Sequence, residues 1–159
     1  MSRRTEESVD DIAEALVMAS RLLVALSARS IADVDETITI PQFRMLVILS
    51  TRGPAKVATL AGILSVQPST ATRMVDRLVS AGLIDRNPNP NSRRELIVEL
   101  TARGRDIVEA VTARRREEIA TVVERIPVAD RHGLVRALTA FTEAGGESGA
   151  AIGLDSYQL

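Results

Sequence analysis

Apolar residues recur at the spacing of a helical face near the beginning of the 159-residue chain. From residue 9 to about residue 32 they repeat at intervals of three and four, which predicts one long amphipathic helix. The polar segment 33–39 is expected to be a loop. A shorter helix should then open at Pro41, whose backbone suits the first turn, and should stop at Gly53.

The middle of the chain carries two short helical patterns with a tight break between them. The first carries Leu60, Ile63 and Leu64 on one face and is broken at 65–67, and Pro68 opens the second. In the second helix the apolar side chains fall at i, i+3, i+4 and i+7, which defines a buried stripe of Ala71, Met74, Val75 and Leu78. Gly82 supplies the left-handed residue that commonly follows a helix. Two short helices joined this way predict a helix-turn-helix.

The pattern then changes from helical to alternating. Residues 83–86 and 95–100 are predicted strands, and the segment between them, NPNPNSRR, is rich in turn-forming residues and ends in two arginines. A short strand at 56–58 is expected to join this hairpin. The predicted fold class is mainly α, of the α+β type: a winged helix-turn-helix core at 41–100 with a small β-hairpin wing.

Two more helices are predicted beyond the wing. Thr101 suits the N-cap of a long helix that runs to about residue 126. Pro127 should open a single last helix that ends near residue 144, which Gly133 weakens by about 1 kcal/mol. Residues 145–159 are rich in Gly and Ser and are expected to be a mobile tail.

The terminal helices, 9–32 and 101–144, lie outside the winged core, and each carries an apolar stripe that needs a cover. The simplest cover is a second copy of the chain, so we predict a homodimer held by these dimerisation helices. A monomeric helical cap on the core is the alternative.

Basic residues are concentrated in the middle of the chain. Residues 41–105 hold ten Lys or Arg and four Asp or Glu, a net charge of +6, whereas residues 1–40 carry −4 and residues 106–159 carry −3. A basic core between acidic ends is typical of a protein that binds nucleic acid through its centre, although the total charge is only −1.

Several other classes of function lack the residues they need. The chain has no cysteine and a single histidine, His132, which argues against a metal site, a disulfide or a nucleophile–base pair. We therefore predict no enzyme activity and no cofactor, and expect His132 at the surface or in an interface. With no run of 18 apolar residues and no signal-peptide core, the predicted location is the cytoplasm, without a membrane span.

The stretch PSTATRMVDRLVSAGLIDR, followed by NPNPNSRRELIVELTARGR, resembles the recognition helix, wing and following helix of MarR-type regulators (multiple antibiotic resistance regulators). The wing signature of that family is Asp-x-Arg, five residues, then Leu-Thr. Here it reads Ser92-Arg93-Arg94, ELIVE, then Leu100-Thr101. Ser92 replaces the Asp, which in the family pairs with a nearby arginine and helps to hold the wing. The resemblance covers roughly residues 9–141 and implies a dimeric regulator of transcription that binds double-stranded DNA.

The exposed face of the second short helix combines small hydroxyl side chains with two arginines, a mixture that suits phosphates and base edges. Two further arginines end the wing turn, where a narrow minor groove would attract them. The predicted DNA-binding residues are Ser69, Thr70, Thr72, Arg73 and Arg77 for the major groove and its phosphates, and Arg93 and Arg94 for the minor groove. Arg94 is favoured over Arg93, because it occupies the signature position of the family.

Three questions stay open at this point. The function predicted is a ligand-responsive repressor of a pseudo-palindromic operator, and the alternative is a winged-helix module that binds another protein without DNA affinity. The resemblance implies a small-molecule effector between the first two helices and the start of the fifth, but no ligand residue can be named. The run Arg114-Arg115-Arg116 is more typical of a solvated helix face than of a phosphate site, since two acids follow it.

Overall fold

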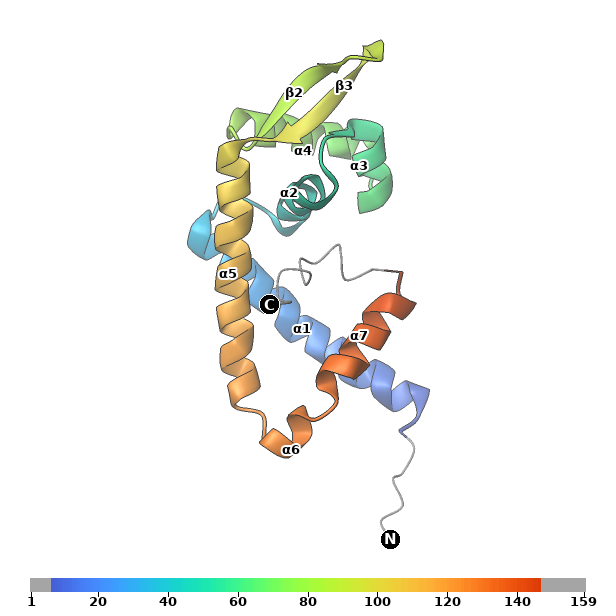
Figure 1. The fold of residues 1–159 in the computed structure, drawn as a ribbon, viewed down its shortest axis with the longest axis vertical. Coiled ribbons are helices and arrows are strands. Elements are labelled where there is room, and N and C mark those ends of the chain that lie inside the picture. Colours follow the sequence, from blue (N-terminus) through green and yellow to red (C-terminus); the bar gives the residue numbers. More distant parts are fainter. Residues whose placement is uncertain (1–6, 147–159) are drawn as a thin grey trace, which may run out of the picture.

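The computed structural model describes residues 7–146 and contains a winged lobe carried by long helices (Figure 1). The expected tail therefore lies outside the described residues, except for its first two. In order, the elements are α1 (Val9–Val34), α2 (Ile40–Arg52), β1 (Ala55–Lys56), α3 (Val57–Leu64), α4 (Pro68–Ser80), β2 (Ile84–Asn89), β3 (Ser92–Leu100), α5 (Ala102–Glu124), α6 (Val128–Arg131) and α7 (Leu134–Ala144).

Capping residues that can be recognised in the sequence determine where several helices begin and end. Capping boxes open α1 at Ser8 and α2 at Thr39, where each hydroxyl accepts a hydrogen bond from the third residue of the helix. Thr101 caps α5 as predicted, since its side chain accepts from the Gly104 amide. Gly82, at φ 73°, takes the left-handed conformation just after α4.

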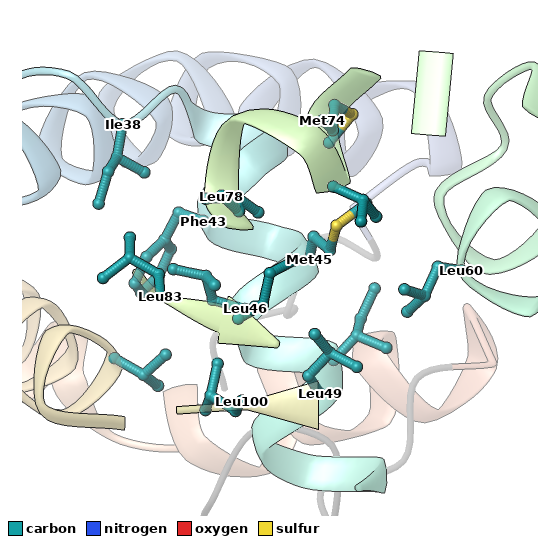
Figure 2. Packing of buried hydrophobic residues seen from close by; sticks show 14 of the residues in the cluster. Ile38, Phe43, Met45, Leu46, Leu49, Leu60, Met74, Leu78, Leu83 and Leu100 are labelled. Carbon is teal, nitrogen blue, oxygen red and sulfur yellow. The ribbon is translucent and has the colours of Figure 1, made fainter. Parts of the chain in front are cut away.

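The core of the winged lobe forms where α2, α3 and α4 pack against the sheet and the start of α5. Figure 2 shows Met45 and Leu46 of α2 among labelled side chains from α3, α4, β3 and the segment just before β2. The predicted stripe of α4 is confirmed, because all four of its members are buried: Ala71, Met74, Val75 and Leu78. This burial fixes α4 with its opposite face outward.

The sheet is antiparallel with strand order β1-β3-β2, so β3 is central. A short third strand joins the hairpin as predicted, but it spans Ala55–Lys56, and residues 57–58 already belong to α3. The hairpin itself differs from the prediction. Its strands continue through most of the Asn- and Pro-rich segment, and only Pro90 and Asn91 form the turn. Pro88 is tolerated in β2 because β2 is an edge strand. Arg93 and Arg94 consequently lie on β3 rather than in the turn.

The prediction of one last helix was wrong. Two helices, α6 and α7, are separated at His132 and Gly133. Gly133 adopts φ 81°, so the chain changes direction there instead of continuing a weakened helix. No residue of α7 is buried, and His132 is exposed as expected.

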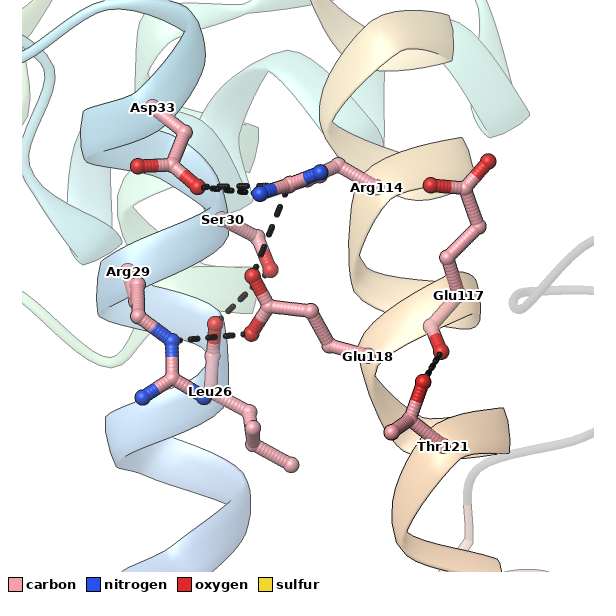
Figure 3. Close-up of polar contacts among 8 residues, drawn as sticks. All are labelled: Leu26, Arg29, Ser30, Asp33, Arg114, Glu117, Glu118 and Thr121. Carbon is pink, nitrogen blue, oxygen red and sulfur yellow. Dashed lines mark hydrogen bonds and ion pairs between the residues drawn. The ribbon is translucent and has the colours of Figure 1, made fainter. Parts of the chain in front are cut away.

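Ion pairs tie α1 to α5 where the two helices cross (Figure 3). Glu118, whose side chain is only 14% exposed, accepts a 3.0 Å bond from Arg29 Nε. Arg114 pairs with Asp33 at 3.1 Å and with Glu118 at 3.5 Å. Arg115 donates to Ser27 Oγ at 3.3 Å. The basic run on α5 thus contributes Arg114 and Arg115 to a joint between helices.

Among the described residues, α1 is long and apolar enough to cross a membrane by length and composition alone, with a mean hydropathy of 1.5 over its best window. A membrane span was excluded from the sequence because the chain has no unbroken run of 18 apolar residues, and α1 does contain polar residues within its apolar sequence. One such helix is weak support for a span, since its end is buried in the protein core at Leu26 and Ile31. An apolar face awaiting a partner helix has the same composition.

Candidate nucleic-acid interface

The predicted major-groove residues share the outer face of α4. Ser69, Thr72, Arg73 and Arg77 are exposed, and Thr70 is half-buried. The Thr72 hydroxyl donates to the Pro68 carbonyl at 3.0 Å, so its oxygen remains available as an acceptor. Because the opposite face of α4 is anchored in the core, this row of hydroxyls and guanidinium groups is held on a rigid support.

The described arginines differ in whether the protein itself binds their side chains. Several are engaged with the protein itself: Arg29, Arg86, Arg103, Arg105, Arg114 and Arg131 form ion pairs or hydrogen bonds. Within residues 7–146, the four predicted DNA-binding arginines, Arg73, Arg77, Arg93 and Arg94, form no such side-chain interaction, and all four are exposed. Unpaired, exposed guanidinium groups are available to bind phosphate or base edges.

A bulge in β3 carries the two wing arginines. Asn89 of β2 pairs with Ser92, but its neighbour Pro88 pairs with Leu96, so residues 93–95 of β3 face no partner in β2. A bulge bends its strand and redirects side chains. Arg93, Arg94 and Glu95 therefore stand on an irregular segment next to the wing turn.

The structure brings one wing arginine next to α4. A cavity of about 310 Å³ lies between α4 and the wing, and its polar lining comes from Lys56, Thr72, Arg86, Arg94 and Glu95. Thr72 and Arg94, predicted for different grooves, border this same cavity. The other predicted residues, Ser69, Thr70, Arg73, Arg77 and Arg93, do not line it.

Two ion pairs that sequence reasoning missed support this region. Arg86 of β2 pairs with Asp76 on the outer face of α4, which links the wing to the helix. Lys56 Nζ of β1 lies 2.7 Å from Glu95 Oε2 of β3. The hydrogen bond from Lys56, its positive charge and a bond from Asn89 lower the pKa of the Glu95 carboxyl, against the opposing effect of burial. Glu95 is therefore ionised at neutral pH.

A second hollow, of about 510 Å³, lies between the end of α1 and the middle of α5, whereas an effector was expected between the first two helices and the start of the fifth. Its lining combines three apolar residues, Val34, Ala110 and Ala113, with two acids, Asp33 and Glu117. Arg114, the one cation among residues 7–146 that lines it, is already paired with Asp33 and Glu118. This lining gives an anionic effector no unpaired positive charge to bind. In the described part of the chain, no group of three or more His, Asp or Glu residues is placed to hold a metal ion.

The helices α3 and α4 and the β2–β3 wing define a winged helix-turn-helix protein, and its exposed arginines suit a nucleic-acid interface. The sequence model of the MarR family matches residues 38–96. The multiple antibiotic resistance protein MarR of Escherichia coli K12 is 32% identical over 108 residues, which are 65% of this chain and 75% of that protein. For MarR of Salmonella typhimurium, 42% identical over 72 residues, the match spans 45% of this chain and only half of that protein.

Solved structures agree with these sequence matches. RV1404 from Mycobacterium tuberculosis is 69% identical, with a TM-score of 0.82 over 90% of this chain and 97% of that one. The C80S mutant of E. coli MarR complexed with operator DNA is 27% identical, with a TM-score of 0.63 over 82% of this chain and 92% of that one. The chain belongs to the MarR family of transcriptional regulators.

Proposed function

We propose that the chain is a homodimeric repressor that binds a pseudo-palindromic DNA operator and acts in the cytoplasm, without catalysis. The observation that carries this proposal is the gathering of four exposed arginines without protein partners among the described residues on one lobe, on the outer face of α4 and on the wing bulge. Operator DNA bound to the similar E. coli MarR supports the same role for this surface. The proposal also includes a small-molecule effector, and its only support is the resemblance to the family.

The most direct test is selection from a mixed genomic DNA pool, repeated across a salt series. Two recognition helices related by a two-fold axis should select half-sites about 10 base pairs apart. Phosphate contacts by arginine should make the affinity fall steeply as the salt concentration rises. Recovery of a palindrome with a steep slope supports the proposal. No enrichment would favour the alternative, a module that binds another protein.

The homodimer is supported by apolar side chains that the single chain leaves exposed. They gather on α1 and on the C-terminal helices: Val9, Ile12, Val17, Met18, Leu22, Leu23 and Val24, then Val123, Val128, Val135, Leu138 and Phe141. A monomeric cap on the core would have buried these side chains, yet α7 buries none of its residues. Exposed apolar side chains in this number favour a protein–protein interface.

Phe141→Asp is expected to raise the dissociation constant of the dimer at least tenfold. Phe141 is 57% exposed, and a buried aspartate without a partner is costly in an apolar interface. Sedimentation equilibrium would measure the change. Leu96→Asp is a matched control, because Leu96 is similarly exposed, at 46%, but lies on the wing. Equal dissociation of the two variants, or none in either, would contradict this interface.

Arg94→Ala is expected to weaken DNA binding by about 1–3 kcal/mol, as measured by fluorescence anisotropy at fixed salt. Arg94 is exposed on the bulge of β3 and borders the cavity between the wing and α4. The DNA affinity of Arg94→Lys, which keeps the charge but loses the forked guanidinium, should lie between those of the wild type and Arg94→Ala. Unchanged binding by Arg94→Ala would remove this side chain from the DNA interface.

A further inference from the structure

The wing of this chain has Ser92 at the position where the wing signature it resembles has an aspartate. Ser92 is half-buried at the start of β3 and has no charge with which to hold an arginine. The bulge that follows it has no ladder pairs to β2. Another contact must therefore hold this segment in one conformation.

Glu95 provides a contact on each side of the bulge. One of its oxygens, Oε2, accepts a bond from Lys56 Nζ at 2.7 Å and another from Asn89 Nδ2 at 3.2 Å. Asn89 in turn accepts a bond from the Asn91 amide at 3.0 Å, within the wing turn. A continuous chain of polar contacts thus runs from β1, through Glu95, to the tip of the wing.

The sheet register explains why these side chains meet. Lys56 pairs with Ile97 across the β1–β3 ladder, so Glu95, two residues earlier on β3, is its diagonal neighbour on the same face. Lys56 lies at the end of β1, directly before α3. It therefore anchors the bulge to the helical body of the lobe and not merely to the other strand of the hairpin.

We propose that Glu95 is a positioning residue for DNA binding: it holds the bulge of β3, through Lys56 and Asn89, so that Arg93 and Arg94 are directed towards the DNA. This inference rests on the proposed function. Glu95 would then favour DNA binding, although its negative charge alone would repel the phosphates.

Whether Glu95→Ala tightens or weakens DNA binding therefore distinguishes a positioning role from simple charge repulsion. If Glu95 acted only through its charge, Glu95→Ala would remove a repulsion and tighten DNA binding. As a positioning residue, its loss is expected to weaken binding three- to tenfold, measured by fluorescence anisotropy on the selected operator. Asp85→Ala is the matched control. Asp85 is an exposed acid on β2 of the same hairpin with no side-chain contact within residues 7–146, and its removal should leave binding unchanged or slightly tighter.

Two further readouts separate positioning from a general loss of structure. Arg94→Ala should cost at least threefold less in the Glu95→Ala background than in the wild type, because the arginine is no longer held in place. The exchanged pair Lys56→Glu with Glu95→Lys should bind more tightly than either single variant. Hydrogen exchange of the amides at 91–95 should quicken in the free Glu95→Ala protein while the amides of α4 stay protected.

The outcomes distinguish this inference from the proposed function. If the wild type binds its operator and Glu95→Ala binds as well as Asp85→Ala, the positioning role is overturned and the proposed function stands. If Arg94→Ala costs the same in both backgrounds, Glu95 does not act through that arginine, and the inference also fails. If the wild type selects no DNA at any salt concentration, both are overturned together.

Discussion

Gly104→Ala is expected to lower the free energy of unfolding by about 3 kcal/mol or more, at the upper end of overpacking effects. Gly104 lies in the first turn of α5, at the base of the wing, and is buried. A methyl group added there would stand 2.1 Å from the Leu83 carbonyl oxygen and 2.8 Å from a methyl of Leu100. The carbonyl cannot move freely, because it accepts the Thr101 amide at 3.1 Å.

Chemical denaturation followed by circular dichroism would measure this loss. Gly62→Ala is the matched control, since Gly62 lies within α3, is exposed, and an added methyl would meet nothing within 4 Å. That change should be neutral or raise stability by up to about 1 kcal/mol, as expected for alanine in a helix. Similar effects of the two substitutions would mean that α5 does not pack against Leu83 as closely as the structure has it.

Most helices of this chain could be predicted because local rules and burial favour the same answer. In α4, the proline at its start and the stripe containing Met74 and Leu78 both specify one helix with one buried face. The break at Gly133 was missed because a propensity scale assigns glycine a cost, whereas the chain uses its left-handed conformation to turn. Similarly, turn-forming residues such as Pro88 hid the length of β2, which is an edge strand.

The sequence predicted the exposed residues of the candidate site but not the ion pairs that support them. The arginines of α4 and the wing could be named because they stand at exposed positions of a recognisable pattern. Their supports could not, because the pairs Arg86–Asp76 and Lys56–Glu95 each join different elements. Pairing across elements depends on sheet register, and a bulge shifts that register without any plain signal in the sequence. Arg114 is exposed and pairs with Glu118, as the run of charges suggested, but its second partner, Asp33, was missed for the same reason, since it is on α1.

Replacing both Arg73 and Arg77 by alanine is expected to weaken operator binding by about 4 kcal/mol, close to a thousandfold. Each arginine that binds DNA contributes about 1–3 kcal/mol, and the double substitution would remove four such arginines from a symmetric dimer. Both side chains are exposed on the outer face of α4, one turn apart. The fold should be unaffected, because the opposite face of the helix holds it in the core.

The two single variants should then divide the roles that the structure leaves open. The arginine that binds phosphate should, when replaced, weaken binding to every sequence and make the salt slope shallower by about one for each phosphate that is no longer neutralised. The arginine that reads a base should instead relax the sequence preference at one position of each half-site, with little change in slope. Arg136→Ala, on α7, removes the same charge far along the chain from the winged lobe and should leave operator affinity nearly unchanged. If the double variant bound as tightly as Arg136→Ala, α4 would not be the recognition helix, and the basic surface of the lobe would need another explanation.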